Sequence, residues 1–118
     1  MPSAAVHIQA AEANEQLARH LAASTWPSWA VVVAFYSGLH WVEAYLDRFR
    51  GAHPRSHDER ENAVARDPRL ARVQQHYFAL RNRCNDVRYE LHPYSRPDAE
   101  AMIRTRLEPL RDHVRSLL

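Results

Sequence analysis

Apolar residues recur every three or four positions over most of the chain, which is the period of an amphipathic helix. The first such segment runs from about Ala4 to Ala23, and its apolar stripe consists of Val6, Ala10, Ala13, Leu17 and Leu21. We expect this stripe to be buried and His7 to lie outside it. Thr25 is the predicted N-cap of the next helix, with Pro27 in its first turn.

The second segment, from about Trp26 to Arg50, is apolar on nearly every side between Ala30 and Leu39. A helix of this kind is usually the central element of a core. Gly51 and Pro54 are predicted to end it. Ser56 followed by Glu59 is a capping-box pattern, and it predicts a short helix that ends near Ala65.

The third long segment shows the clearest periodicity, and we expect it to begin with Asp67 as N-cap and Pro68 as first residue and to end near Tyr89. Its predicted seam consists of Leu70, Val73, Tyr77, Leu80, Cys84, Val87 and Leu91. A last helix is expected from about Pro97, with a kink or break at Pro109 because proline removes a helical hydrogen bond. The prediction is an all-α fold: one domain over residues 1–118, a four-helix up-and-down antiparallel bundle with one additional short helix.

Composition changes this picture little. All sixteen basic residues are Arg, the net charge is +2, and only arginines clustered on one face would indicate a nucleic-acid partner. Codon bias in a GC-rich genome is the simpler explanation of the missing Lys. Cys84 is alone and lies on the seam. The sequence shows no secretion signal and no apolar run that spans a membrane, so we expect a cytoplasmic protein without a membrane partner. No cofactor motif occurs.

Polar residues form a stripe on the second helix, at Tyr36, His40, Glu43 and Asp47. One interpretation is an acid-base or metal-binding face inside the bundle. The simpler one is a set of buried groups that pair with arginines of neighbouring helices. The order of His40 and Glu43 is the reverse of the di-iron motif, so we assign no metal site, although a zinc ion held by His40, His57 and a third residue remains an alternative.

The third helix carries a second polar region. Arg81 and Arg88 flank its seam on one side and Arg83 on the other. A further group, Phe78, Asn82, Asn85 and Tyr89, is expected to point away from the seam. This is either a surface for a partner or an ordinary solvated face.

Three segments together resemble the HEPN superfamily, small prokaryotic helical bundles often paired with nucleotidyltransferases in toxin-antitoxin and defence systems. They are residues 35–45 (Phe-Tyr-Ser-Gly-Leu-His-Trp-Val-Glu-Ala-Tyr), Ser56-His57 with Arg60, and residues 77–89, which end in Arg88-Tyr89. The resemblance implies a HEPN-like bundle in a bacterial protein, a homodimer, and a nucleotidyltransferase-type antitoxin as a partner.

Active HEPN ribonucleases carry an Arg, often followed by Asn, with a His a few residues later. Arg81-Asn82 matches the start of this motif, but Asp86, Val87 and Arg88 occupy the positions where the His would lie. RNA cleavage through the 2′-hydroxyl needs a base near neutral pH, which Arg cannot supply. The departure therefore favours binding over cleavage.

The working hypothesis is a non-catalytic or divergent HEPN-like module that binds RNA, a nucleotide or a cognate protein. Its expected ligand-binding residues are Glu43, Arg60, Arg81, Asn82, Asn85, Arg88 and Tyr89. The second hypothesis is a metal-independent endoribonuclease toxin that uses Arg81 with His57 or His40. The third is a structural partner subunit without a ligand.

Overall fold

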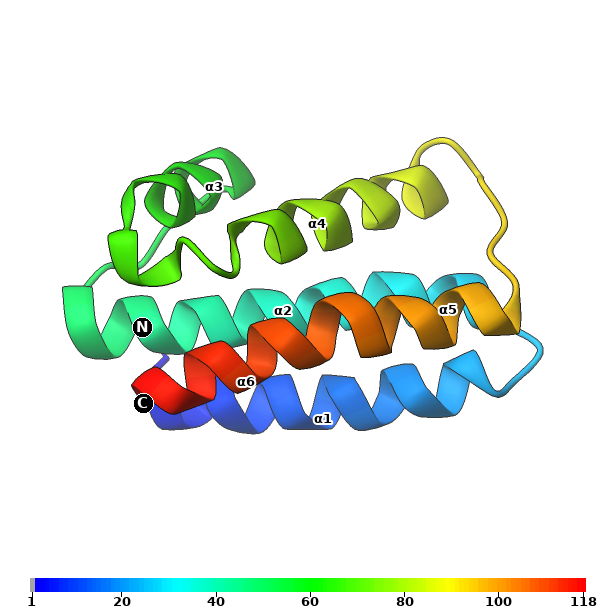
Figure 1. Cartoon of the computed structure of the whole chain (residues 1–118), viewed down its shortest axis with the longest axis horizontal. Coiled ribbons are helices and arrows are strands. Elements are labelled where there is room, and N and C mark those ends of the chain that lie inside the picture. Colours follow the sequence, from blue (N-terminus) through cyan, green and yellow to red (C-terminus); the bar gives the residue numbers. More distant parts are fainter. Residues whose placement is uncertain (1) are drawn as a thin grey trace.

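Four helical rods run up and down in the computed structural model, which describes residues 2–118 (Figure 1). They are α1 (Ala4–Ala22), α2 (Pro27–Arg50), α4 (Gln74–Arg88), and a last rod that joins α5 (Arg96–Met102) to α6 (Glu108–Leu117). The short helix α3 (His57–Arg66) lies beside α4, and no strand occurs among the described residues. The predicted all-α bundle with one additional short helix is confirmed. Within residues 2–118, none of the helices combines the length and the apolar character that crossing a bilayer requires.

The core is built around α2, as its apolar sequence predicted. Phe35, Trp41 and Leu46 are almost completely buried in it. Gly38 allows the neighbouring rods to approach closely, because a Cβ added there would lie 3.2 Å from a Leu80 methyl carbon and 3.5 Å from one of Leu110. The side of α2 that carries Gly38 thus contacts α4 and α6, and other sides of the helix face α1 and α3.

The predicted buried stripe of α1 is wrong for most of its residues, although Leu21 is half-buried and packs against the core. Val6 and Leu17 are 51% and 46% exposed, and Ala13 is exposed as well. The residues that face the bundle instead are Ala4, His7, Ala11, Ala18 and Ala22. Small side chains let the backbones of α1 and α2 approach, so that the Ser37 hydroxyl donates a 2.7 Å hydrogen bond to the carbonyl of Ala11. The side of α1 that faces the bundle is therefore the one that allows close backbone packing, and not the one that would bury the larger apolar area of Val6 and Leu17.

The third rod is shorter than predicted. Asp67 and Pro68 open a separate 3-10 turn (Pro68–Leu70), and α4 begins only at Gln74. A 3-10 turn has three residues per turn, so it keeps both Leu70 and Val73 buried without a continuous α-helix.

The predicted seam holds as far as Val87 but fails at Leu91, which is 82% exposed. Its φ of 56° places Leu91 in the left-handed conformation. In the same turn the N–H of His92 donates to the carbonyl of Asp86 at 2.9 Å. This pattern terminates a helix, and it turns Leu91 away from the core.

Three predicted helix ends can be compared with the structure. Gly51 ends α2 with a φ of 58°, as expected. The Ser56 hydroxyl accepts from the N–H of Glu59 at 3.1 Å, but the Glu59 carboxylate bonds to the N–H of Arg55, so only half of the capping box forms. Thr25 is not the N-cap of α2. Trp26 occupies that position without a side-chain cap.

Pro109 does not break the last rod. A π-helical turn (Ile103–Leu107) precedes it and joins α5 to α6 as one continuous rod (Figure 1). A π turn is a common way to absorb the hydrogen bond that a proline cannot make. The rod therefore keeps Ile103, Leu107 and Leu110 buried on both sides of the disturbance.

Candidate functional site

The polar stripe of α2 lies where α1, α3 and α4 meet that helix, and two of its residues contact α1. His40 Nδ1 lies 3.0 Å from Nδ1 of His7, and Asp47 accepts from the N–H of Ala4 at 2.8 Å. We call the larger group that includes the first three residues of this stripe the polar face. Its members are Tyr36, His40, Glu43, His57, Arg60, Arg81, Asn85 and Arg88.

Two stripe residues pair with arginines of other helices, as the simpler interpretation predicted. Nε of Arg60, on α3, donates to Glu43 at 2.6 Å, and Nη1 of Arg88, on α4, donates to the Tyr36 hydroxyl at 3.0 Å. The first pair is almost buried, with side chains only 10% and 7% exposed, whereas Arg88 is exposed. The polar face therefore has a buried half around Arg60 and an exposed half around Arg88.

The buried half fixes the orientation of His57. A second nitrogen of Arg60, Nη1, lies 3.3 Å from Nδ1 of His57. A guanidinium can only donate, so Nδ1 is the acceptor and a neutral His57 carries its proton on Nε2. Burial, together with the charges of Arg81 and Arg60, lowers the pKa of His57 below its usual value of 6.5. At pH 7 His57 is thus a neutral ring that offers one N–H.

Arg81 and His57 border the same aromatic ring. The Phe35 ring centroid lies 5.9 Å from that of His57 and 5.7 Å from Cζ of Arg81. Arg81 also donates to Glu61 at 3.3 Å and to the side-chain oxygen of Asn85. These contacts hold a guanidinium and an imidazole N–H together above a fully buried apolar ring.

Arg88 completes the exposed half. Its Cζ lies 5.1 Å from the centroid of the Tyr89 ring, which is a cation-π contact, and Tyr89 itself is 64% exposed. Among residues 2–118 no carboxylate forms an ion pair with Arg88, whereas Arg60 and Arg81 are paired with Glu43 and Glu61. The polar face therefore keeps one uncompensated positive charge at its exposed end.

The hydroxyl of Tyr77 lies beneath the polar face without a hydrogen-bond partner among the described residues. Burial raises the pKa of Tyr77 to about 12, against the opposing effect of the nearby Arg60 charge. The sequence placed Tyr77 correctly on the seam of α4, but periodicity carries no information about where the polar end of a buried ring lies.

His7 was missed as a site residue. Burial is the main cause that lowers the pKa values of both His7 and His40, and the charge of His7 lowers that of His40 further. Because the two Nδ1 atoms face each other, one of them must carry a proton and the other must accept it. The spacing of Ala4, Ala11 and Ala18, seven residues apart, was the signal that this side of α1 faces the bundle.

The structure brings most of the predicted site residues together. The polar face includes Glu43, Arg60, His57, Arg81, Asn85 and Arg88, and it includes His40 at the side that meets α1. Asn82 is exposed and points elsewhere, and Tyr89 touches the face only through Arg88. Within residues 2–118 no group of three or more His, Cys, Asp or Glu side chains is placed to hold a metal ion. Cys84 is buried, which raises its pKa.

No known family model, no characterised protein and no solved structure matches this chain significantly. The HEPN resemblance consequently remains a prediction from the residues themselves. The function has to be argued from the geometry of the polar face.

Proposed function

We propose that the chain is a non-catalytic, HEPN-like module that binds single-stranded RNA on the exposed half of its polar face. The observation that carries the proposal is the exposed guanidinium of Arg88, which has no carboxylate partner in the described part of the chain and lies beside Arg81 and the N–H of His57. All of these groups donate hydrogen bonds, which is what a phosphate requires. Exposed Tyr89 next to Arg88 offers a ring on which a base can stack.

The protonation of His57 supports binding rather than cleavage. A general base must present an unprotonated nitrogen to the substrate, but Nδ1 of His57 already accepts from Arg60. The remaining nitrogen carries a proton and can donate to a phosphate oxygen. His40 contacts His7 through its Nδ1, so only its Nε2 is left to meet a substrate.

Fluorescence anisotropy with a short uridine oligonucleotide tests this proposal. We expect Arg88→Gln and Arg81→Gln to weaken binding, each by about tenfold, because each removes a charge-assisted hydrogen bond. Arg104→Gln is the matched control, since Arg104 is exposed but lies on the π-helical turn away from the polar face. A wild-type protein that binds no RNA contradicts the proposal and favours a cognate protein as the partner.

A metal-independent endoribonuclease is the alternative, and one observation favours it. His57 lies beside Arg81, so a phosphate-stabilising cation and an imidazole border the same ring of Phe35. Incubation of the protein with RNA between about pH 6 and 8, the range in which His titrates, separates the two functions. Cleavage that is lost in both His57→Ala and Arg81→Ala supports the enzyme, and intact RNA at every pH excludes it.

We also propose that the protein is a homodimer, in line with the HEPN resemblance, and that a second copy covers the apolar side of α1. Val6 and Leu17 on α1 and Trp26 and Trp29 at the start of α2 are all 46% exposed or more. They account for four of the six exposed large apolar residues of the described chain, and a second copy that covered them would remove their apolar area from water. Sedimentation equilibrium is expected to give a dimer for the wild type and a monomer for Leu17→Glu. A wild-type monomer at all concentrations contradicts this assignment.

A further inference from the structure

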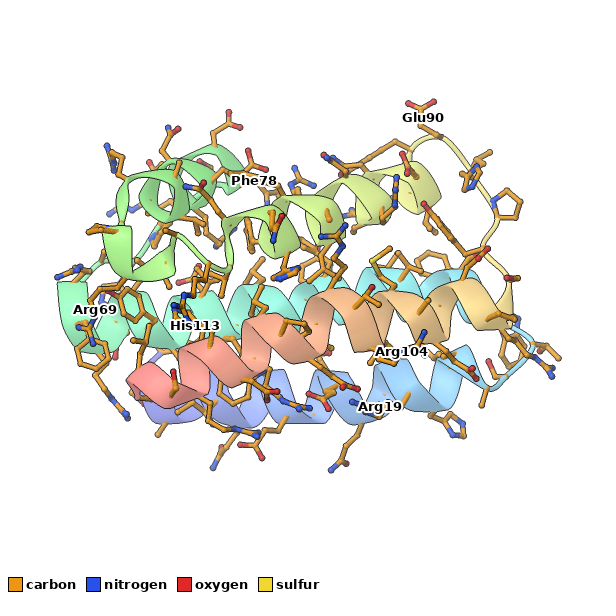
Figure 2. All side chains as sticks on the ribbon, in the orientation of Figure 1. Arg19, Arg69, Phe78, Glu90, Arg104 and His113 are labelled. Atoms are coloured by element: carbon orange, nitrogen blue, oxygen red, sulfur yellow. The ribbon has the colours of Figure 1, made fainter. Side chains whose placement is uncertain are left out.

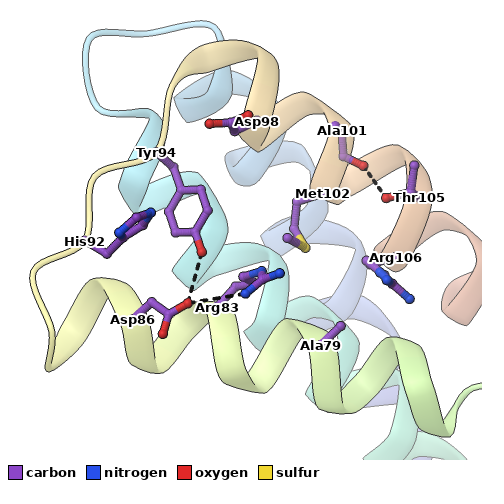
Figure 3. A pocket seen from close by; sticks show the side chains of 10 residues that line it. All are labelled: Ala79, Arg83, Asp86, His92, Tyr94, Asp98, Ala101, Met102, Thr105 and Arg106. Atoms are coloured by element: carbon purple, nitrogen blue, oxygen red, sulfur yellow. Dashed lines mark hydrogen bonds and ion pairs between the residues drawn. The ribbon is translucent and has the colours of Figure 1, made fainter.

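A second polar hollow lies on the opposite side of α4 from the polar face, between α4 and the α5 segment (Figure 3). We call it the α4–α5 groove. Its volume is about 500 Å³, and its walls carry Arg83 and Asp86 from α4, His92 and Tyr94 from the following loop, and Met102 and Arg106 from the last rod. None of these residues belongs to the polar face. A volume of this size suits a small-molecule ligand.

The groove also carries Asp98, so its two arginines, Arg83 and Arg106, share the hollow with two carboxylates, but among residues 2–118 only Arg83 and Asp86 form an ion pair there. Arg106 is half-buried, and among residues 2–118 no carboxylate forms an ion pair with it. Its closest described polar contact is Nδ1 of His76, at 3.4 Å. Burial and the charge of Arg106 lower the pKa of His76, so at neutral pH this ring accepts from the guanidinium and adds no charge. A half-buried cation of this kind is suited to an anion supplied by a ligand.

Arg83 adds a second donor to the same hollow. Its side chain is 51% exposed, and its Nη1 lies 3.6 Å from Asp86, a loose pair that leaves most of its donors free. Figure 3 shows Arg83 entering from α4 while Arg106 enters from the last rod. Two guanidinium groups that reach one hollow from different helices are typical of a phosphate site.

The loop supplies an aromatic wall. The Tyr94 hydroxyl donates to Asp86 at 3.1 Å, and the rings of His92 and Tyr94 meet edge to face, with centroids 4.9 Å apart. The hydrogen bond fixes the Tyr94 ring before a ligand arrives, so little side-chain entropy would be lost on binding. Met102 lines the apolar part of the groove, and its thioether packs well against aromatic rings.

The π-helical turn explains how the last rod comes to form one wall of the groove. The π turn directly precedes Pro109, which has no N–H to donate, and within it the Thr105 hydroxyl donates to the carbonyl of Ala101 at 2.7 Å. The turn changes the direction of the side chains within it, and Arg106 lines the groove while Arg104 lies on the other side, beside Arg19 (Figure 2). Single π turns of this kind frequently occur at functional sites.

We propose that the α4–α5 groove binds a nucleoside monophosphate, with the phosphate at Arg83 and Arg106 and the base between Tyr94 and Met102. This assignment does not depend on RNA binding by the polar face. A simple anion site would bind the phosphate alone. In this groove the two guanidinium groups bind the phosphate, and the aromatic wall separately binds the base.

Adenosine 5′-monophosphate, adenosine and inorganic phosphate are the probes, titrated into the full-length protein by isothermal calorimetry and by amide NMR shifts. We expect saturable binding of the monophosphate, tighter than that of either fragment, with shifts concentrated at residues 83, 94 and 106. Arg106→Gln is expected to raise Kd about tenfold or more, and Arg83→Gln severalfold. Tyr94→Leu should weaken the nucleotide but not phosphate.

Two controls separate this groove from general charge effects and from the polar face. Arg104→Gln and Arg88→Gln should leave the Kd of the monophosphate unchanged, and Arg106→Gln should leave RNA binding unchanged. Circular dichroism shows whether each variant is folded. If Arg106→Gln does not fold, Arg83→Gln tests the groove in its place. No saturable binding, equal affinity for phosphate alone, or an equal loss in either control overturns the proposal.

Discussion

The buried and the exposed halves of the polar face use the same residue types under different physical conditions. Arg60 and Glu43 form an ion pair with almost no solvent exposure, whereas Arg88 meets only a tyrosine hydroxyl and an aromatic ring at the surface. A buried charge depends on its partner, because water cannot replace the lost interaction. An exposed guanidinium is solvated without any partner and remains free to bind one. The comparison teaches that the buried arginine is held by the fold, whereas the exposed one is free for the ligand proposed above.

The largest expected effect follows from breaking the buried pair. Glu43→Leu leaves the Arg60 charge buried without its partner, and we expect the free energy of unfolding to fall by about 3 to 5 kcal/mol. Urea denaturation followed by circular dichroism measures this loss.

A double substitution serves as the control for this prediction. Glu43→Leu combined with Arg60→Met removes both charges and should restore most of the stability, because a buried ion pair replaced by apolar residues is often neutral or better. If Glu43→Leu unfolds at the wild-type urea concentration, the pair is solvated and the division into two halves is wrong.

A smaller loss is expected at the junction with α1. His40→Leu removes the partner of His7, whose ring is only 8% exposed, and leaves its Nδ1 unsatisfied. We expect a destabilisation of about 1 to 3 kcal/mol. His20→Leu, on the exposed surface of α1, is the matched control and should differ little from the wild type. Equal melting curves for His40→Leu and His20→Leu would show that the pair adds nothing.

The same histidines predict how stability depends on pH. The folded-state pKa values of His7 and His40 lie below the unfolded value of about 6.5, so the unfolded chain takes up protons first as the pH falls. Stability should be complete above about pH 6.5 and decline below it, and His7→Gln should reduce this decline. Thermal melts at several pH values check the sign. A wild type that gains stability on acidification through this range contradicts the assignment.

The bundle was predictable from the sequence because its core depends on periodicity. The seam from Leu70 to Val87 and the central role of α2 follow directly from apolar spacing. The face of α1 was not predictable in the same way, because two stripes with helical spacing compete there. The larger side chains of Val6 and Leu17 favoured the wrong stripe, and the close approach of α1 to α2 selected the alanines.

The candidate site was predictable only in its residue types. Glu43, Arg60 and Arg81 were identified, and the spacing in α2 indicated that arginines would pair with the polar stripe. The division between a buried and an exposed half depends on how α3 and α4 lie against α2, which no local pattern contains. The α4–α5 groove could not be predicted for the same reason, since it depends on a loop and a π turn.

The smallest expected effect on stability lies in the exposed half. Arg88→Gln removes a surface side chain with no ion pair, and we expect a change within about 0.5 kcal/mol. Urea denaturation of this variant should therefore overlay that of the wild type, in contrast to Glu43→Leu. A loss comparable to that of Glu43→Leu would mean that Arg88 also serves the fold.

The dependence of RNA affinity on salt tests the proposed role of the exposed half most directly. Each phosphate contact contributes about 0.7 to the slope of log affinity against log salt concentration for a single strand. Anisotropy titrations of the uridine oligonucleotide at several salt concentrations should therefore give Arg88→Gln a slope shallower by about 0.7 than the wild type, and Arg104→Gln the wild-type slope. Identical slopes for all three proteins would contradict a phosphate contact at Arg88.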